Sequence, residues 1–299
     1  MQNLSRRSFL YTTGTATAGL SLGSPFGRTG TPRLRLALAA YSFRQFFPFQ
    51  KTSKREVKER PMDMAKFIDF CAAHGCTGTE LTSYFFPRPL PRAHLVGLRR
   101  RAFLSGVEIS GTAVGNNFSL PQGPARDAQV AYVKQWIDHA AVLGAPHVRV
   151  FAGRAPKGVS RDEADRWAIA ALRECCDHAA KHGIFLGIEN HDSIGDAKSL
   201  LRFVKAVDHE WFGVNLDSGN FRTNDPYVDF AAAAPFAVNV QVKVEMRVGG
   251  QTQPTDFKRI AALLRQAKYQ GYVTLEYEAR EDPYTAVPPL LKQLGALMG

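Results

Sequence analysis

The sequence predicts an α/β protein of the (β/α)8 (TIM) barrel class, with a single domain over residues 31–299. One pattern recurs along the chain: an amphipathic helical segment ends in Gly, a short apolar run follows, and the run ends in a polar residue. A repeat that alternates helix and strand indicates stacked βα units. Eight apolar runs occur, which is the number that closes a barrel. A doubly wound open sheet would carry a glycine-rich turn after its first strand, and the segment AAYSFRQFF has none.

The elements follow from this repeat in chain order. Each strand is a short run rich in Val, Ile, Leu or Phe, and we predict strands over 34–43, 76–84, 107–114, 147–153, 184–190, 212–218, 237–245 and 271–278. Each helix shows apolar residues at three- and four-residue spacing, and we predict helices over 61–74, 91–104, 125–143, 161–182, 197–207, 226–233, 255–269 and 283–297. Glycine takes positive φ without strain, so we expect helices to end at Gly75, Gly106, Gly144, Gly183, Gly213 and Gly271.

The seventh strand has an unusual pattern. From residue 238 to 245, four valines alternate with Asn239, Gln241, Lys243 and Glu245. With a period of two, the valines face the helices and all four polar residues face the barrel axis. Buried polar side chains need partners, so this interior either forms a functional site or is an internal hydrogen-bonded network.

Composition limits the function classes. The chain has 299 residues, is 45% hydrophobic and carries a net charge of +11. The excess charge is local, in the first 33 residues, in the segment 51–60 and in Arg99–Arg101. No nucleic-acid-binding motif accompanies it, so we expect no nucleic-acid partner. The four cysteines, which form no CxxC motif, are expected to be small buried residues; a Cys71–Cys76 disulfide is the alternative.

The first 30 residues resemble an export signal. Residues 5–10, SRRSFL, are similar to the twin-arginine motif, and the weakly apolar run 9–23 that follows is too short and polar for a stable membrane span. We therefore expect a leader over residues 1–30 and a mature protein that acts in the periplasm. Residues 44–60 form a basic insert after the first strand, for which a lid and a subunit contact are the two interpretations.

Acidic residues end several strands in the second half of the chain. The runs 184–188 and 212–216 are followed by Glu189 and Asp217, and an amphipathic helix over 197–207 lies between them. The carboxyl ends of parallel strands meet at one rim of a barrel, which is where its chemistry is found. His191 and Asn220 stand just beyond the two acids.

Two further strands add Gln241 and Glu276 to this rim. Three carboxylates and an amide oxygen form a hard-oxygen site that suits Mn²⁺ or Mg²⁺, with Zn²⁺ and Co²⁺ as alternatives. Without a cation, the carboxylates would repel one another and their pKa values would rise. The sequence therefore predicts a metal site formed by Glu189, Asp217, Gln241 and Glu276.

The segments GIENH, NLDSGNF, VQVKVEM and VTLEYE, together with AYSF and GTELTSY, resemble the xylose isomerase-like barrel superfamily of sugar phosphate isomerases and epimerases. The resemblance covers the chain after the leader. It implies a metal held by Glu189, Asp217, the strand-seven residue and Glu276, with the two glutamates also acting as the acid/base pair. Two positions depart from the family pattern: Gln241 replaces the usual His ligand, and Asn220 stands where epimerases often place a substrate-contacting His.

Five residues are candidate substrate contacts: His191, Asn220, Lys243, Arg247 and Glu80. For three of them a structural role is an equal alternative. Lys243 would then form an internal salt bridge, Arg247 would lie in a solvated loop, and Glu80 would serve packing.

The resemblance and the strand-end acids together indicate a metal-dependent sugar isomerase or epimerase that transfers a proton next to a carbonyl. Export argues for a non-phosphorylated or oxidised sugar as the small-molecule partner. The alternatives are a lyase or hydrolase of keto-sugar glycosides and a non-catalytic sugar-binding barrel. The endonuclease relatives of this barrel need a histidine-rich zinc cluster, and only His191 stands at the rim. A homo-oligomer is compatible with the sequence.

Overall fold

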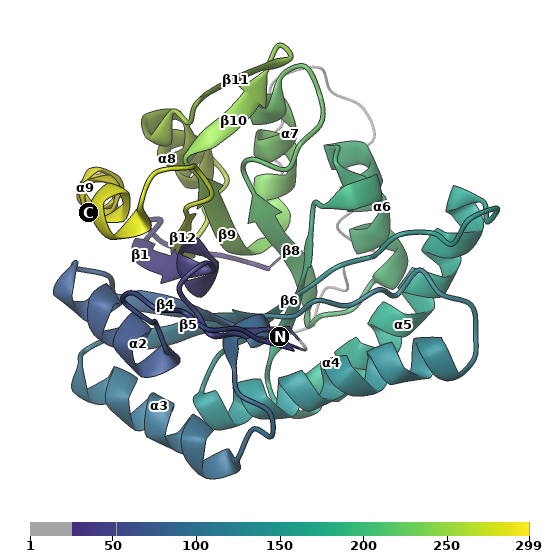
Figure 1. Cartoon of the computed structure of the whole chain (residues 1–299). Helices are drawn as coiled ribbons and strands as arrows, with labels where there is room; N and C mark the ends of the chain where they lie inside the picture. The colour runs from purple at the N-terminus through teal and green to yellow at the C-terminus, as the bar shows by residue number, and fades with distance from the viewer. Residues whose placement is uncertain (1–25, 52, 299) are drawn as a thin grey trace.

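The computed structural model describes residues 26–51 and 53–298 and forms a closed barrel of eight parallel strands (Figure 1). In chain order the strands are β1 (Leu34–Ala39), β4 (Gly78–Thr82), β5 (Glu108–Ala113), β6 (His147–Val150), β7 (Phe185–Glu189), β8 (Phe212–Asp217), β9 (Ala237–Lys243) and β12 (Gly271–Glu276). Each strand pairs with its neighbour in chain order, and β1 pairs with β12 to close the ring. The predicted (β/α)8 class is confirmed.

In the described part of the chain, eight helices surround the barrel. They are α2 (Met64–Ala73), α3 (Arg92–Leu104), α4 (Pro124–Leu143), α5 (Arg161–Lys181), α6 (Ala197–Val207), α7 (Pro226–Ala233), α8 (Phe257–Gln266) and α9 (Pro283–Gly295). Five of them begin after an aspartate whose carboxylate accepts a backbone N–H of the first turn: Asp63, Asp196, Asp225, Asp256 and Asp282. Such caps satisfy backbone donors that the helix itself leaves free.

The predicted helix terminators are confirmed at four positions and wrong at two. Gly75, Gly106, Gly144 and Gly183 have φ between 65° and 76°. Helix α6 instead ends at Asp208, with φ of 46°, and Lys268, with φ of 53°, follows α8. Gly213 lies within β8, where an added Cβ would collide with the side chain of Val238.

Two segments of predicted strand take another form. Strand β1 stops at Ala39, and Ala40–Phe43 forms a 3-10 helix. The chain leaves the barrel after Lys243 and forms a hairpin of β10 (Glu245–Val248) and β11 (Gln251–Pro254). Glu245 is therefore exposed, and the expectation that it faces the barrel axis is wrong. The alternation of apolar and polar residues continues from β9 into the hairpin, so the sequence pattern does not show where the barrel strand ends.

The basic insert after β1 lies against its own barrel. It contains the short hairpin of β2 (Phe49–Gln50) and β3 (Ser53–Lys54). The Lys51 amide donates to the carbonyl of Tyr84, after β4, and Arg44 donates to the carbonyl of Tyr277, after β12. The insert thus lies beside the carboxyl ends of β4 and β12.

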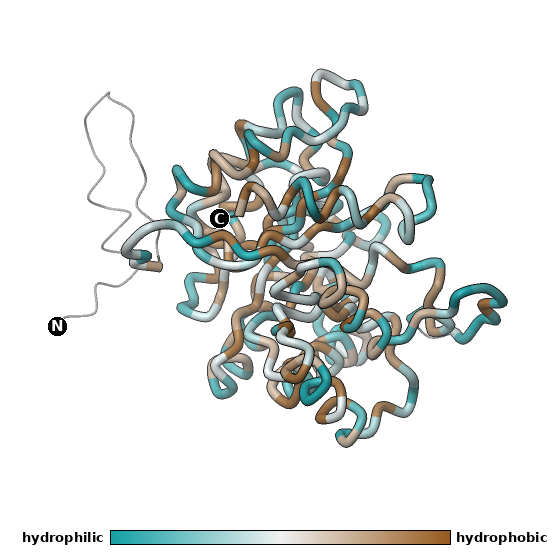
Figure 2. The backbone as a smooth tube through the Cα atoms, turned by 90° about the vertical axis from the view of Figure 1, so that its left-hand side faces the viewer, coloured by the Kyte–Doolittle hydropathy of each residue, from teal (hydrophilic) through white to brown (hydrophobic). Residues whose placement is uncertain are grey.

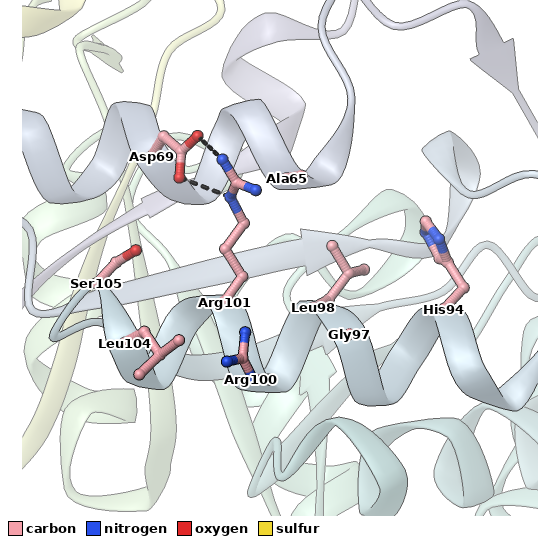
Figure 3. A pocket seen from close by; sticks show the side chains of 9 residues that line it. All are labelled: Ala65, Asp69, His94, Gly97, Leu98, Arg100, Arg101, Leu104 and Ser105. Carbon is pink, nitrogen blue, oxygen red and sulfur yellow. Dashed lines mark hydrogen bonds and ion pairs between the residues drawn. The ribbon is translucent and has the colours of Figure 1, made fainter.

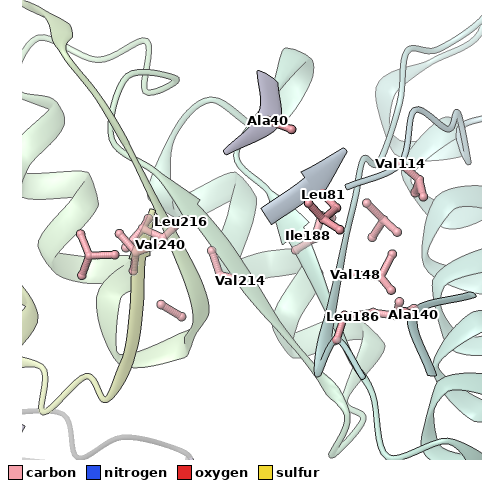
Figure 4. Close-up of a cluster of buried hydrophobic side chains, with 14 of the residues drawn as sticks. Ala40, Leu81, Val114, Ala140, Val148, Leu186, Ile188, Val214, Leu216 and Val240 are labelled. Atoms are coloured by element: carbon pink, nitrogen blue, oxygen red, sulfur yellow. The ribbon is translucent and has the colours of Figure 1, made fainter. Parts of the chain in front are cut away.

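The apolar core lies between the strands and the helices. Leu186, Ile188, Val214, Leu216 and Val240 are fully buried in this layer (Figure 4). Along the backbone, hydrophobic segments run through the centre of the molecule and hydrophilic ones lie mostly at the outer loops (Figure 2). Burial of this surface is the main stabilising contribution to folding. All four cysteines are free and buried, so no Cys71–Cys76 disulfide forms.

The amino-terminal end of the described chain packs on the barrel. The ring of Phe26 meets that of Phe185 edge to face at 5.7 Å, and Arg28 donates to the carbonyl of Ala237, where β9 begins. The first 25 residues of the predicted leader lie outside the described residues, while residues 26–30 contact the end of the barrel where the strands start. Among the described helices, none has the length and apolar character that a membrane span requires.

Candidate active site

Four predicted residues meet at the carboxyl ends of adjacent strands. Glu189, Asp217 and Glu276 end β7, β8 and β12, and Gln241 lies near the end of β9; these strands are consecutive in the barrel. All four residues are buried, with exposed fractions between 0 and 6%. Lys243, Asn220 and Glu278 lie above them and are partly open to solvent.

Glu189 is held by two side chains. The Arg149 guanidinium, from β6, lies 2.9 Å from Oε2 of Glu189, and the Asn220 amide donates to Oε1 at 2.7 Å. Arg149 itself is fixed, because it donates to the carbonyl of Val114 at 3.0 Å and stacks over Phe151. A buried carboxylate with a paired cation and a second donor is both stabilised and oriented.

Lys243 supplies the second buried cation. Its Nζ lies 3.1 Å from Oδ2 of Asp217 and donates to the carboxylates of Glu276 and Glu278. Burial alone would lower the pKa of Lys243, but the surrounding carboxylates outweigh it and raise the pKa well above its usual value. The side chain is therefore a stable ammonium. The predicted alternative of an internal salt bridge for Lys243 is the arrangement that the structure shows.

A chain of side-chain amides extends from Gln241 into the barrel. Gln241 Nε2 donates to Oε1 of Glu80 at 2.7 Å and to Oε2 of Glu276 at 2.9 Å, and its Oε1 accepts from Asn215 at 2.6 Å. Asn239 Nδ2 in turn donates to Asn215 at 2.8 Å and to Glu80 at 3.0 Å.

The contacts with two carboxyl groups set the direction of this amide network. Gln241 Nε2 donates to oxygens of both Glu80 and Glu276, so its carbonyl oxygen is left to accept from another side chain. The carbonyl oxygen of Gln241 consequently points to Asn215, away from Glu276. The polar interior predicted from the β9 pattern is an internal hydrogen-bonded network with a carboxylate site above it.

Burial perturbs the acids of this network. Burial raises the pKa of Glu80 to about 7, although Arg149 and the Gln241 amide oppose it. It also raises the pKa of Asp217 to about 6, against the opposing effect of Lys243. The pKa of Glu276 is raised well above its usual value by burial. The pKa of the more exposed Glu278 is lowered to about 2, because Lys243 outweighs its partial burial.

His191 and Arg247 are more exposed than the four strand-end residues. His191 follows β7, its side chain is 37% exposed, and its Nδ1 lies 3.1 Å from the Asp192 carboxylate. Arg247 is exposed on β10 and donates to the carbonyl of Gly250 at the hairpin turn. That placement matches a solvated loop.

Sequence reasoning missed Arg149, Asn215 and Glu278 as site residues. Asn215 and Glu278 each lie two residues from a predicted residue, so the period of two along a strand was the available signal for them. Glu278, for example, follows Glu276 with the same alternation. Arg149 lies on β6, and only the pairing of β6 with β7 brings it to Glu189.

The family that the sequence resembles implies a divalent metal. The strand-end acids suit such an ion in their charge and in their oxygen ligands. Glu189, Asp217 and Glu276 end their strands at one rim, Oδ2 of Asp217 accepts no hydrogen bond from the described residues, and the nearby Lys243 ammonium marks a position that favours a cation. Two features weaken the site: the Gln241 oxygen is engaged by Asn215, and the three acids do not bring one oxygen each within 4.8 Å of one another.

A cleft elsewhere on the molecule is less suited to this chemistry. A cavity of about 450 Å³ lies between α2 and α3 (Figure 3) and is lined by residues such as His94, Arg100 and Leu104. The ion pair of Arg101 with Asp69 closes one side of it. It contains none of the strand-end carboxylates.

Known proteins share this architecture. The chain is similar to an L-ribulose 3-epimerase (16% identity, TM-score 0.69, covering 89% of this chain and 93% of that one). It is also similar to 3-keto-D-glucoside 4-epimerase from E. coli (16% identity, TM-score 0.65, covering 89% of this chain and 99% of that one). A third similar structure is that of a xylose isomerase-like TIM barrel protein from Mycobacterium smegmatis in complex with magnesium (20% identity, TM-score 0.67, covering 89% of this chain and 98% of that one).

No curated protein sequence matches the chain. The model of one sequence family, described as the xylose isomerase-like TIM barrel, matches residues 68–294, which include the four strand-end residues and most of the barrel. The protein is therefore a member of the xylose isomerase-like TIM barrel family.

Proposed function

We propose that this protein is a sugar isomerase or epimerase that transfers a proton at a carbon next to a carbonyl. The observation that carries the proposal is the placement of two buried carboxylates, Glu189 and Glu276, on β7 and β12, on either side of β8 and β9. Two carboxylates that flank one centre can address opposite faces of a substrate carbon. The sugar epimerases among the structural neighbours support the same reaction class.

The two glutamates have environments suited to different roles. Glu189 is balanced by Arg149 and held in place by Asn220, so it acts as the base that removes the proton. Burial raises the pKa of Glu276, which favours the protonated form that a general acid needs. Pairs of acids with different environments are typical of acid/base catalysis.

Lys243 is positioned to stabilise negative charge on the substrate. Its ammonium has three N–H groups and contacts Asp217, Glu276 and Glu278. The Glu278 side chain is 40% exposed, so a substrate oxygen can replace this contact from the solvent side. The ammonium then donates to the oxygen that becomes negative when the adjacent C–H is deprotonated.

A divalent metal, with Mn²⁺ or Mg²⁺ ahead of Zn²⁺ and Co²⁺, is part of the proposal. Glu189, Asp217 and Glu276 would hold it, and Gln241 has the strand position that the family assigns to the fourth ligand. When bound, it would polarise the sugar carbonyl. Lys243 would then turn away from Asp217 to make room, and Gln241 would have to exchange its contact with Asn215.

The proposed substrate is a non-phosphorylated or oxidised sugar. We also propose that the protein is exported through the twin-arginine route and acts in the periplasm without its leader. His191, Asn220, Lys243, Arg247 and Glu80 are the proposed substrate contacts. Of these, Asn220 and Lys243 contact the carboxylates directly, whereas Arg247 would need the β10–β11 hairpin to approach the mouth.

A lyase or hydrolase of keto-sugar glycosides is the second candidate. The observation that favours it is the similarity to a 3-keto-D-glucoside 4-epimerase, since deprotonation next to a keto group also prepares loss of a glycosidic oxygen. The same carboxylates would serve both reactions.

A substrate panel separates these functions. The protein, with added Mn²⁺, is incubated with free ketoses, free aldoses and 3-keto-glucosides, and products are followed by proton NMR. A new epimer or isomer supports the proposal, and release of the aglycone supports the second candidate. Absence of any conversion across the panel, with the protein folded, contradicts both.

A further inference from the structure

A cluster of metal-ligating side chains lies on the outer surface, away from the barrel mouth. His178 and His182 are one turn apart at the carboxyl end of α5, and Asp138 faces them from α4. Among the described residues, they form the one group of three or more His, Cys, Asp or Glu ligand atoms that all lie within 4.8 Å of one another. Nothing in the proposed isomerase site uses these residues.

The three ligand atoms converge on one point. Oδ1 of Asp138 lies 2.7 Å from Nε2 of His178 and 3.2 Å from Nε2 of His182. Residues four apart on a helix lie on the same face, and the two imidazole rings are 5.0 Å apart. A Zn–N bond of about 2.0–2.1 Å would fit between them after small side-chain rotations.

The charges around the cluster also favour a cation. One turn earlier on the same two helices, Glu174 is balanced by Lys134 and Arg126, both at 2.6 Å. Asp138, by contrast, has only the two imidazoles as ion-pair partners within the described chain. A bound cation would give Asp138 the positive partner that Glu174 already has.

The cluster is accessible. The side chains of His178, His182 and Asp138 are 25%, 35% and 53% exposed, so an ion can enter without opening the fold. Two imidazoles and one carboxylate leave a coordination position that faces solvent.

We propose that Asp138, His178 and His182 form a surface site for a late first-row transition ion, of which Zn²⁺ is the representative. Imidazole ligands suit Zn²⁺, Cu²⁺ and Ni²⁺, whereas the all-oxygen acids of the barrel mouth suit harder ions. The ion ties α4 to α5 near their carboxyl ends. This site is independent of the proposed isomerase function.

The test uses Zn²⁺ titrated calorimetrically into the full-length protein with excess Mg²⁺ present to occupy the barrel mouth. We expect one Zn²⁺ per chain. Zn²⁺ affinity should fall at least about tenfold in each of three variants, His178→Gln, His182→Gln and Asp138→Asn. Even the loss of a residue that only hydrogen-bonds to a metal ligand reduces affinity by about this factor. The matched control is His209→Gln, because His209 lies 3.5 Å from Asp177 without a second imidazole. It should bind Zn²⁺ as the unmodified protein does.

A second measurement does not depend on variants. In ¹⁵N-labelled unmodified protein, Zn²⁺ should shift the Nε2 resonances of two histidines together, in step with loading of one equivalent. A Zn²⁺ titration that is unchanged in all three variants, or no histidine shift when Zn²⁺ is added to the unmodified protein, would overturn the proposal.

Discussion

The ammonium of Lys243 lies 3.1 Å from Oδ2 of Asp217 and also contacts Glu276, so it joins the carboxylates that end β8 and β12. An internal cation thus stands among acids that would otherwise repel one another. Its contacts with Glu276 and Glu278 extend the ion-pair network from the buried floor of the site to its solvent side.

Replacement of Lys243 by a neutral residue should destabilise the protein and increase its response to a divalent cation. Lys243→Met leaves Asp217 and Glu276 without their ammonium, and breaking a buried pair costs roughly 3–5 kcal/mol in unfolding free energy. Added Mn²⁺ should raise the melting temperature of this variant more than that of the unmodified protein. Lys258→Met, on the exposed face of α8, is the matched control and should change neither quantity. Equal Mn²⁺ responses in all three proteins would contradict a cation position at Lys243.

Substitutions of Glu189 and Glu276 should have different kinetic effects from a substitution of their neighbour Glu278. Glu276→Gln and Glu189→Gln keep the size of the side chain but remove the acid, so kcat should fall roughly 10²- to 10⁴-fold, with a smaller change in KM. Glu278→Gln, which lies outside the buried pair, should affect KM more than kcat. Steady-state rates on a substrate found in the panel provide the measurement. A kcat unchanged in either of the first two variants would remove that residue from the mechanism.

Stability should depend on pH through Glu80. Its pKa is raised by burial to about 7 in the folded protein, so the folded state binds the proton more tightly than the unfolded state. The resulting stability is present below the unfolded pKa and is lost as pH rises through about 7. The loss amounts to roughly 3 kcal/mol between pH 4 and 8, from the 1.36 kcal/mol that one pKa unit represents.

Urea unfolding of the unmodified protein and of Glu80→Gln at several pH values checks this dependence. Both proteins share the contribution of Asp217, whose pKa is also raised, so the difference between their slopes isolates Glu80. Parallel slopes would show that Glu80 does not titrate in this range. The Gln variant should be less stable at low pH, because its N–H₂ group replaces one carboxyl oxygen and meets the N–H donor of either Gln241 or Asn239.

The barrel interior should tolerate no side chain at Gly187. His147, buried between β5 and β7, would lie 2.5 Å from the Cβ of an alanine there and 2.7 Å from one at Gly111. Gly187→Ala should therefore destabilise the protein by about 1–3 kcal/mol, as overpacking does. Gly97→Ala on α3, where a Cβ meets no described atom within 4 Å, should stabilise it by about 0.5–1 kcal/mol. Thermal unfolding of the two variants gives the comparison, and equal effects would contradict the packing argument.

Much of this architecture could be predicted from local patterns. The eight strands and their helices follow from the repeat of amphipathic segments, glycines and apolar runs. The meeting of Glu189, Asp217, Gln241 and Glu276 follows from the parallel arrangement, because strand order alone brings their carboxyl ends to one rim.

The direction of individual side chains could not be predicted in the same way. Nothing local shows that the Gln241 oxygen accepts from Asn215, because that orientation is set by carboxylates on two other strands. The role of Arg149 likewise depends on the pairing of β6 with β7. Glu245 was misplaced because a hairpin continues the alternation of β9.

The most direct test of proton transfer by Glu189 and Glu276 is an NMR experiment in D₂O with a converted sugar. A carbon-bound proton next to the carbonyl should exchange for solvent deuterium during turnover, because carboxylates that remove and return protons also exchange them with water. The exchange should be lost in both Glu189→Gln and Glu276→Gln. A product formed with full retention of the original hydrogen, or exchange that persists in both variants, would contradict the proposed mechanism.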